Sequence, residues 1–122
     1  MPKKILYVDD SVSMRQIISM SLKKEGYEVE LASDGNEALS LLAKDRYDAI
    51  ITDLKMPKMD GLNFVKKVRE HPNNRFSSLV MLTTEASHEK KIEGKELGVK
   101  VWVNKPIHPD KLTEIMKKLI GH

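Results

Sequence analysis

Polar residues able to transfer a phosphoryl group stand directly after short apolar runs in this chain. They comprise three carboxylates, two hydroxyls and one ammonium group: Asp9, Asp10, Asp53, Thr83, Thr84 and Lys105. Two like charges about 4 Å apart repel by roughly 4 kcal/mol at an effective dielectric constant near 20. If the carboxylates meet in the fold, either one of them holds a proton or a cation neutralises the cluster.

The candidate ligands are all oxygen atoms, because no histidine or cysteine adjoins these positions. Such a set favours a hard ion, so Mg²⁺ is the expected metal, and Mn²⁺ would accept the same ligands. Magnesium typically takes one or two carboxylates together with a phosphate oxygen, which leaves one carboxylate free to attack phosphorus. Lys105 would then neutralise charge on the phosphoryl oxygens, and the Thr83 hydroxyl would donate to one of them.

Five segments with the pattern of strands position these residues. Residues 5–8, 49–52 and 79–82 are continuous, largely apolar runs, whereas 28–31 and 99–104 alternate between apolar and polar side chains. Continuous runs are typical of strands buried on both faces, and alternating runs are typical of strands with one exposed face.

Helical patterns separate the strands. After Ser11, a candidate cap, the apolar residues with helical spacing are Met14, Ile17, Ile18 and Leu22. Similar patterns lie around 38–42, 62–68, 87–97 and 112–120. The apolar stripe of 87–97 is thin, chiefly Ile92 and Leu97, which predicts a loosely packed helix.

Strict alternation of strands and helices predicts an α/β fold, a doubly wound five-stranded parallel sheet flanked by five helices. The buried runs belong in the centre and the alternating runs at the edges, which the order 2-1-3-4-5 satisfies with right-handed crossovers. Ligands of such sheets bind beyond the carboxyl ends of the strands, where the polar residues described above would meet.

Composition limits the class of protein. The 122 residues suit a single domain spanning 1–122 with no output domain, so we expect no DNA-binding output in cis. The absence of cysteine excludes disulfides and thiol catalysis. Without a signal peptide or a run of about 20 apolar residues, we expect a cytoplasmic monomer that does not bind membranes. A net charge of +3, with basic and acidic residues interspersed, does not favour nucleic acid as a partner.

The polar residues fall in motifs that resemble the receiver domain of two-component response regulators over the whole chain. These motifs are Asp9-Asp10, the stretch 52–61 around Asp53, Thr83, and Lys105-Pro106. The stretches 82–86, 89–95 and 102–106 also resemble the chemotaxis subgroup, the CheY-type proteins. The resemblance implies a flavodoxin-like fold, the same architecture that the pattern of strands predicts.

The resemblance also implies a role for each site residue. Asp53 would accept a phosphoryl group from a phosphohistidine on a histidine kinase of the CheA type. Asp10 and Asp53 would bind the metal directly, Asp9 would do so through water, and Lys55 would contribute its main-chain carbonyl. The domain would catalyse only its own phosphorylation and dephosphorylation, and would not be an enzyme acting on other substrates.

Phosphorylation would switch a partner-binding surface. Thr83 would move toward the phosphoryl group, Trp102 in the last strand would change rotamer with it, and the bond before Pro106 would be cis. We expect the surface at the 87–97 helix and the last strand and helix to bind partners, through Lys90, Lys91, Lys95, Lys100 and Trp102. Its lysines would favour an acidic peptide, from a flagellar motor switch protein or a phosphatase; an ordinary solvated lysine face is the alternative.

Three positions near the phosphoacceptor are expected to affect how fast the acyl phosphate is hydrolysed. Lys55 and Thr84 stand where Asn and a small residue are frequent in CheY-type proteins. We expect Lys55 and Glu85 to form a charge pair across the site and to set the lifetime of the acyl phosphate. Thr84 would narrow the access to the phosphoryl group.

Other functions remain open on the sequence alone. Within the family, the chain could be a phosphate sink or a relay intermediate. An aspartate-nucleophile phosphatase of the haloacid-dehalogenase kind is disfavoured, because position 55 is lysine where that motif has a second acid. A flavodoxin-like cofactor binder is disfavoured too, because two acids follow the first strand where a phosphate-binding loop would be needed.

Overall fold

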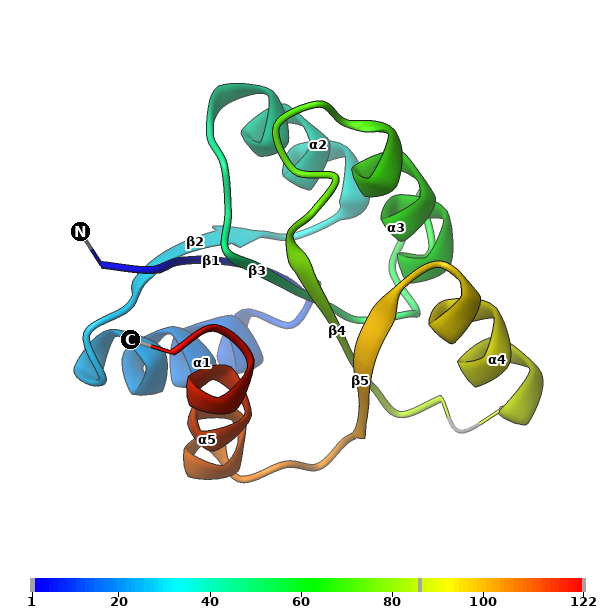
Figure 1. The fold of residues 1–122 in the computed structure, drawn as a ribbon. Coiled ribbons are helices and arrows are strands. Elements are labelled where there is room, and N and C mark those ends of the chain that lie inside the picture. The colour runs from blue at the N-terminus through cyan, green and yellow to red at the C-terminus, as the bar shows by residue number, and fades with distance from the viewer. Residues whose placement is uncertain (1, 86, 122) are drawn as a thin grey trace.

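The computed structural model describes residues 2–85 and 87–121, in which strands and helices alternate strictly (Figure 1). The strands are β1 (Lys4–Val8), β2 (Glu28–Ala32), β3 (Ala49–Thr52), β4 (Ser78–Thr83) and β5 (Val99–Asn104). The helices are α1 (Val12–Lys24), α2 (Gly35–Lys44), α3 (Gly61–Glu70), α4 (His88–Glu96) and α5 (Pro109–Ile120).

All five strands pair in parallel in the order β2-β1-β3-β4-β5, which confirms the predicted topology. Every residue of β3 and β4 is buried, whereas β2 and β5, at the two edges, each contain exposed residues. Continuous apolar runs therefore occupy the centre of the sheet and alternating runs its edges, as expected for a sheet covered on both faces.

Helices α1 and α5 cover one face of the sheet, and α2, α3 and α4 cover the other (Figure 1). Alternate side chains of a strand point to opposite faces, so β1 contributes to both hydrophobic cores. Ile5 and Tyr7 pack with α1 and α5, whereas Leu6 and Val8 pack with α2 and α3.

Side-chain caps fix where each helix begins. The capping side chains accept a backbone N–H of the first turn in all five helices, and they are Ser11, Asp34, Asp60, Ser87 and His108. Because each helix follows a strand, these capped N-termini lie toward the carboxyl edge of the sheet, around the predicted site.

Two helices test the predicted apolar patterns. Ile17 does not face the core: its side chain is 49% exposed, because the buried stripe of α1 runs through Ile18 and Leu22 and Ile17 is rotated by about 100° from it. The thin packing predicted for α4 is confirmed, since Gly94 is its one buried residue and Ile92 is 46% exposed. None of the helices in the described part of the chain has the length and apolarity needed to cross a bilayer.

Candidate functional site

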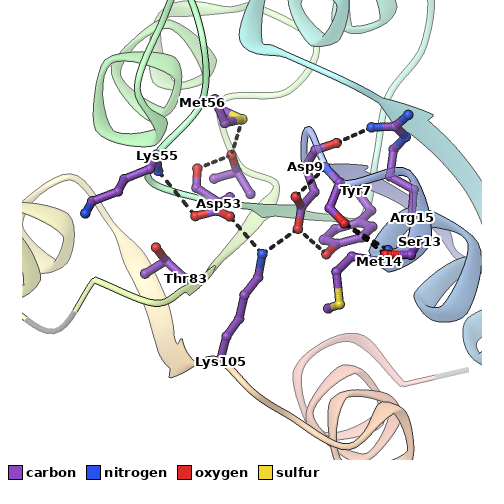
Figure 2. A network of polar contacts seen from close by, with 12 residues as sticks. Tyr7, Asp9, Ser13, Met14, Arg15, Asp53, Lys55, Met56, Thr83 and Lys105 are labelled. Carbon is purple, nitrogen blue, oxygen red and sulfur yellow. Dashed lines mark hydrogen bonds and ion pairs between the residues drawn. The ribbon is translucent and has the colours of Figure 1, made fainter.

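The sheet brings the predicted polar residues together at the carboxyl ends of its strands (Figure 2). Asp9 and Asp10 follow β1, Asp53 follows β3, and Thr83 is the last residue of β4. Carboxylate oxygens of the three aspartates lie within 4.8 Å of one another. Asp9 and Asp53 are buried and Asp10 is exposed, so the cluster opens to solvent on one side.

The ammonium group of Lys105 bridges two of these carboxylates. Its Nζ atom lies 2.7 Å from Asp9 Oδ2 and 2.8 Å from Asp53 Oδ2. Burial by itself lowers the pKa of Lys105, but the hydrogen bonds to Asp53 and Asp9 outweigh burial and raise that pKa above its ordinary value. Lys105 therefore stays charged and offsets the repulsion between the two acids.

The Asp9 carboxylate is wholly buried and accepts three hydrogen bonds. Oδ2 accepts from the Tyr7 hydroxyl at 2.7 Å as well as from Lys105, and Oδ1 accepts from the Ser11 N–H at 3.0 Å. Burial alone would raise the pKa of Asp9, but the bonds from Lys105, Tyr7 and Ser11 hold it below its usual value. The Asp9 carbonyl accepts from Arg15 Nη1 at 2.6 Å, which fixes the backbone of this loop.

Asp53 is held by the start of the loop that follows it. Its Oδ1 accepts from the Lys55 N–H at 3.2 Å, and its carbonyl accepts from the Thr52 hydroxyl at 2.9 Å. Gly61, the first residue of α3, donates to the Leu54 carbonyl at 2.7 Å. A Cβ atom on Gly61 would lie 2.3 Å from the Asp53 carbonyl oxygen, so only glycine permits this close approach.

Thr83 connects the site to Trp102 through the backbone of Glu85. The buried Thr83 hydroxyl accepts from the Glu85 N–H at 3.2 Å, and the Glu85 carbonyl accepts from Trp102 Nε1 and Asn104 Nδ2, both at 3.2 Å. The Trp102 ring packs over Gly94, where a Cβ atom would lie 3.1 Å from the indole. Thr83 and Trp102 are therefore linked by two hydrogen bonds in series.

Lys55, Thr84 and Glu85, the three residues predicted to affect the lifetime of the acyl phosphate, lie beside the site. Lys55 Nζ lies 3.6 Å from Glu85 Oε2, which confirms the predicted charge pair. Thr84 lines a cavity of about 290 Å³ together with Met14, Lys105, Pro106 and Ile107. The bond between Lys105 and Pro106 is cis, as predicted.

The donor chemistry of the cluster fits a hard divalent cation. Within the part of the chain that the structure describes, it offers three carboxylates and no nitrogen or sulfur ligand, and the exposed Asp10 leaves room for water on the metal. Asp9 is fully buried and its carboxylate accepts three hydrogen bonds, whereas the Asp53 carboxylate accepts two and Asp10 is exposed, so Asp10 and Asp53 are better placed to bind an ion directly.

The predicted partner surface is largely brought together by the fold. Lys91, Lys95, Lys100 and Trp102 line one cavity of about 700 Å³ between α4 and β5. Lys90 is not among the residues that line it.

Arg69, which the sequence pattern did not single out, lines the same cavity and forms hydrogen bonds with two of the segments around it. Its guanidinium group donates to the carbonyls of Leu97 at 3.1 Å, Gly98 at 3.0 Å and Ser77 at 3.1 Å, and also to that of Arg75. Burial lowers the pKa of Arg69. One side chain of α3 thereby holds both the turn before β5 and the segment before β4.

Comparison with known proteins defines the class. Residues 5–117 match the family described as the response regulator receiver domain. The curated response regulator MprA of Mycolicibacterium vanbaalenii is 37% identical over 120 residues, which cover 98% of this chain and 51% of that protein. The chain belongs to the response regulator receiver family, and it spans about half the length of the curated relatives it matches.

Solved structures place the chain among CheY-like proteins. Chemotaxis protein CheY4 of Vibrio cholerae is 47% identical, with a TM-score of 0.92 over 98% of this chain and 99% of that one. The receiver domain of a sensor histidine kinase from Pseudomonas aeruginosa, with magnesium coordinated in its active-site cleft, is 29% identical with a TM-score of 0.88 over 100% of both chains. TrrA of Thermotoga maritima, solved with Mg²⁺ and BeF, is 31% identical with a TM-score of 0.83 over 96% of this chain and 98% of that one. The chain is therefore a CheY-type receiver domain.

The lowered pKa of Asp9 predicts a pH-dependent stability. Because its folded-state pKa lies below the ordinary value of 3.8, ionised Asp9 stabilises the fold above about pH 4, and this contribution is lost as the pH falls through the folded-state pKa. Denaturant unfolding between about pH 5 and about pH 2 should show a loss of unfolding free energy that is about 1 kcal/mol smaller in Asp9→Asn than in the wild type. Asp10→Asn is the matched control, because the Asp10 side chain is exposed. An equal pH dependence in wild type and Asp9→Asn would contradict the prediction.

Proposed function

We propose that this domain is a phosphorylation switch in which Asp53 accepts a phosphoryl group from a histidine kinase. The observation that supports this best is the position of Lys105, whose ammonium group lies 2.8 Å from the Asp53 carboxylate at a buried acidic edge. A cation placed there can neutralise the charge that develops on a transferring phosphoryl group.

The proposed reaction is an in-line displacement. A carboxylate oxygen of Asp53 forms a bond to phosphorus while the bond from phosphorus to the imidazole nitrogen of the donor breaks, and the electron pair of that bond returns to the nitrogen. Lys105 contacts the phosphoryl oxygens, and the Thr83 hydroxyl turns from the Glu85 N–H to donate to one of them. The product is an acyl phosphate on Asp53, and only this domain is modified.

A divalent cation fits this scheme as a resident cofactor, with Mg²⁺ preferred. Asp10, Asp53 and the Lys55 carbonyl would hold it directly, with Asp9 acting through water. When bound, it supplies positive charge that offsets the repulsion between the acids and the incoming phosphate.

The proposed output is a change in the surface around Trp102. When Thr83 moves, the Glu85 backbone that binds both Thr83 and Trp102 loses one of its partners. Trp102 is free to change rotamer only if its bond to the Glu85 carbonyl breaks. The thin packing of α4 lets this helix adjust at low cost.

Chemotaxis is the proposed context, and a kinase of the CheA type is the proposed donor. The identity to CheY4, at 47% over nearly the full length of both chains, supports that choice. We propose that the domain acts in the cytoplasm, as a monomer.

Phosphorylation itself is tested with a small phosphodonor. Wild type incubated with acetyl phosphate and MgCl₂ should gain the mass of one phosphoryl group, and Asp53→Asn should gain none. Asp110→Asn removes an exposed carboxylate of α5 and should be labelled like the wild type. Intact-protein mass spectrometry gives the readout, and full labelling of Asp53→Asn would rule out the assignment.

The Lys55–Glu85 pair should lengthen the lifetime of the acyl phosphate by covering the path of water. The Lys55 side chain is 70% exposed, so the pair is worth at most about 1 kcal/mol, or about fivefold in rate. Lys55→Ala and Glu85→Ala should each lose phosphate up to about fivefold faster, measured on domain freed of donor. Lys58→Ala breaks a similar pair with Asp34, at 3.7 Å, and should have no effect. Wild-type rates in both site variants would exclude this role.

The lysine surface should select an acidic partner. Charge reversal in Lys91→Glu/Lys95→Glu should abolish capture of the partner by the domain activated with beryllofluoride and Mg²⁺, whereas Lys23→Glu/Lys24→Glu on α1 makes the same charge change on the other face of the sheet and should not. The pull-down should compare flagellar motor components and phosphatases with kinases and phosphotransfer proteins. Recovery of phosphotransfer proteins alone would favour a phosphate sink or a relay. Equal capture by both charge-reversal variants would contradict the surface.

A further inference from the structure

Tyr7 brings a hydroxyl group into the core next to the acidic site (Figure 2). Its neighbours in β1 are aliphatic, and its side chain is fully buried. Burying a hydroxyl costs free energy unless it finds a hydrogen-bond partner. The Tyr7 hydroxyl finds that partner in Asp9 Oδ2, at 2.7 Å, so the phenol at this core position is matched to the site and not to packing alone.

Tyr7 and Lys105 share one oxygen atom. Asp9 Oδ2 accepts from the Tyr7 hydroxyl and from Lys105 Nζ, each at 2.7 Å, while Oδ1 accepts from the Ser11 N–H, its one donor among residues 2–85 and 87–121. Lys105 in turn divides its ammonium group between Asp9 and Asp53. A continuous chain of hydrogen bonds therefore runs from Tyr7 through Asp9 and Lys105 to the proposed phosphoacceptor.

This sharing matters when Lys105 changes partner. In the proposed function, Lys105 turns from Asp9 to the oxygens of a phosphoryl group on Asp53. A buried carboxylate that loses its cation is costly unless other donors remain. After Lys105 leaves, the Tyr7 hydroxyl and the Ser11 backbone N–H still donate to Asp9.

We propose that Tyr7 is a positioning residue whose hydroxyl holds the Asp9 carboxylate in place and so lets Lys105 transfer to the phosphoryl group. The proposal rests on the proposed function of Asp53 and adds a residue from the core of the sheet to it. Without the hydroxyl, Asp9 Oδ2 has Lys105 as its sole donor and retains it more strongly. The phosphorylated state, and not metal binding, should then be impaired.

Tyr7→Phe tests this role because it keeps the aromatic ring and removes only the hydroxyl. MgCl₂ alone is titrated first, and beryllofluoride is then titrated at saturating Mg²⁺, with emission of Trp102, the single tryptophan, as the readout. The midpoint for Mg²⁺ should stay within about twofold of the wild type, because the Tyr7 hydroxyl donates to Asp9 and not to Asp10 or Asp53, the two carboxylates proposed to bind the ion directly. The apparent Kd for beryllofluoride should rise about tenfold or more, the loss expected for one hydrogen bond to a charged group. ¹⁹F NMR of bound beryllofluoride measures the same affinity independently of Trp102.

Tyr47→Phe is the matched control, since Tyr47 is also a buried tyrosine but lies just before the amino-terminal end of β3, whereas the site lies at the carboxyl ends of the strands. Its affinities for both ligands should equal those of the wild type. Unchanged beryllofluoride affinity in Tyr7→Phe, or equal weakening of Mg²⁺ and beryllofluoride, would overturn the role of Tyr7. Failure of the wild type to be phosphorylated at Asp53 would instead contradict the proposed function, so the two failures are distinguishable.

Discussion

The ammonium group of Lys105, held between the carboxylates of Asp9 and Asp53, is the interaction on which the site depends. A parallel sheet with acids at the ends of β1 and β3 concentrates negative charge in a partly buried place, and that charge must be offset. The offsetting cation comes from the far edge of the sheet, 96 residues after Asp9 in the chain. Lys105 therefore offsets the charge of this acidic edge once β5 has joined the sheet and brought its ammonium group into reach.

This dependence explains why the site has few degrees of freedom. The backbone of Lys105 donates to the Thr83 carbonyl at 2.8 Å, so the end of β5 is fixed to the end of β4. Asp53 is fixed by the close packing of its carbonyl against Gly61, and Asp9 by its three donors. What remains adjustable is the choice of partner for Lys105 and for the Thr83 hydroxyl, which are the groups that a phosphoryl group would attract.

Much of this arrangement could be predicted from the sequence, because parallel α/β topology turns a one-dimensional pattern into a spatial one. Continuous runs at 49–52 and 79–82 indicated central strands, and the residues after each run therefore had to meet at one edge. The pairing of Lys55 with Glu85 was predicted from the family resemblance, which places them two residues after Asp53 and two residues after Thr83. The roles of these residues in phosphoryl transfer remain predictions.

Features that depend on side-chain direction could not be predicted in this way. Ile17 has the spacing of a core residue but lies beside the buried stripe of α1, because helical periodicity alone does not say how wide the buried stripe is. In the sequence, Tyr7 is one residue of a largely apolar run of four, and a sequence pattern does not show where its hydroxyl points. Arg69 resembled any lysine or arginine near a helix end, and its four carbonyl partners come from segments distant in the chain.

The hydrogen bonds that Arg69 donates to backbone carbonyls affect how α4 can move. They fasten the carboxyl-terminal end of this helix, through Leu97 and Gly98, to α3, while along its length α4 buries only Gly94. A helix that is fixed at one end and weakly packed along its length is expected to rotate about the fixed end. The largest displacement then falls at the amino-terminal end near Ser87, whose N–H binds the Glu85 carboxylate at 3.1 Å. A shift of Glu85 would therefore be passed to the end of α4 that Arg69 does not hold.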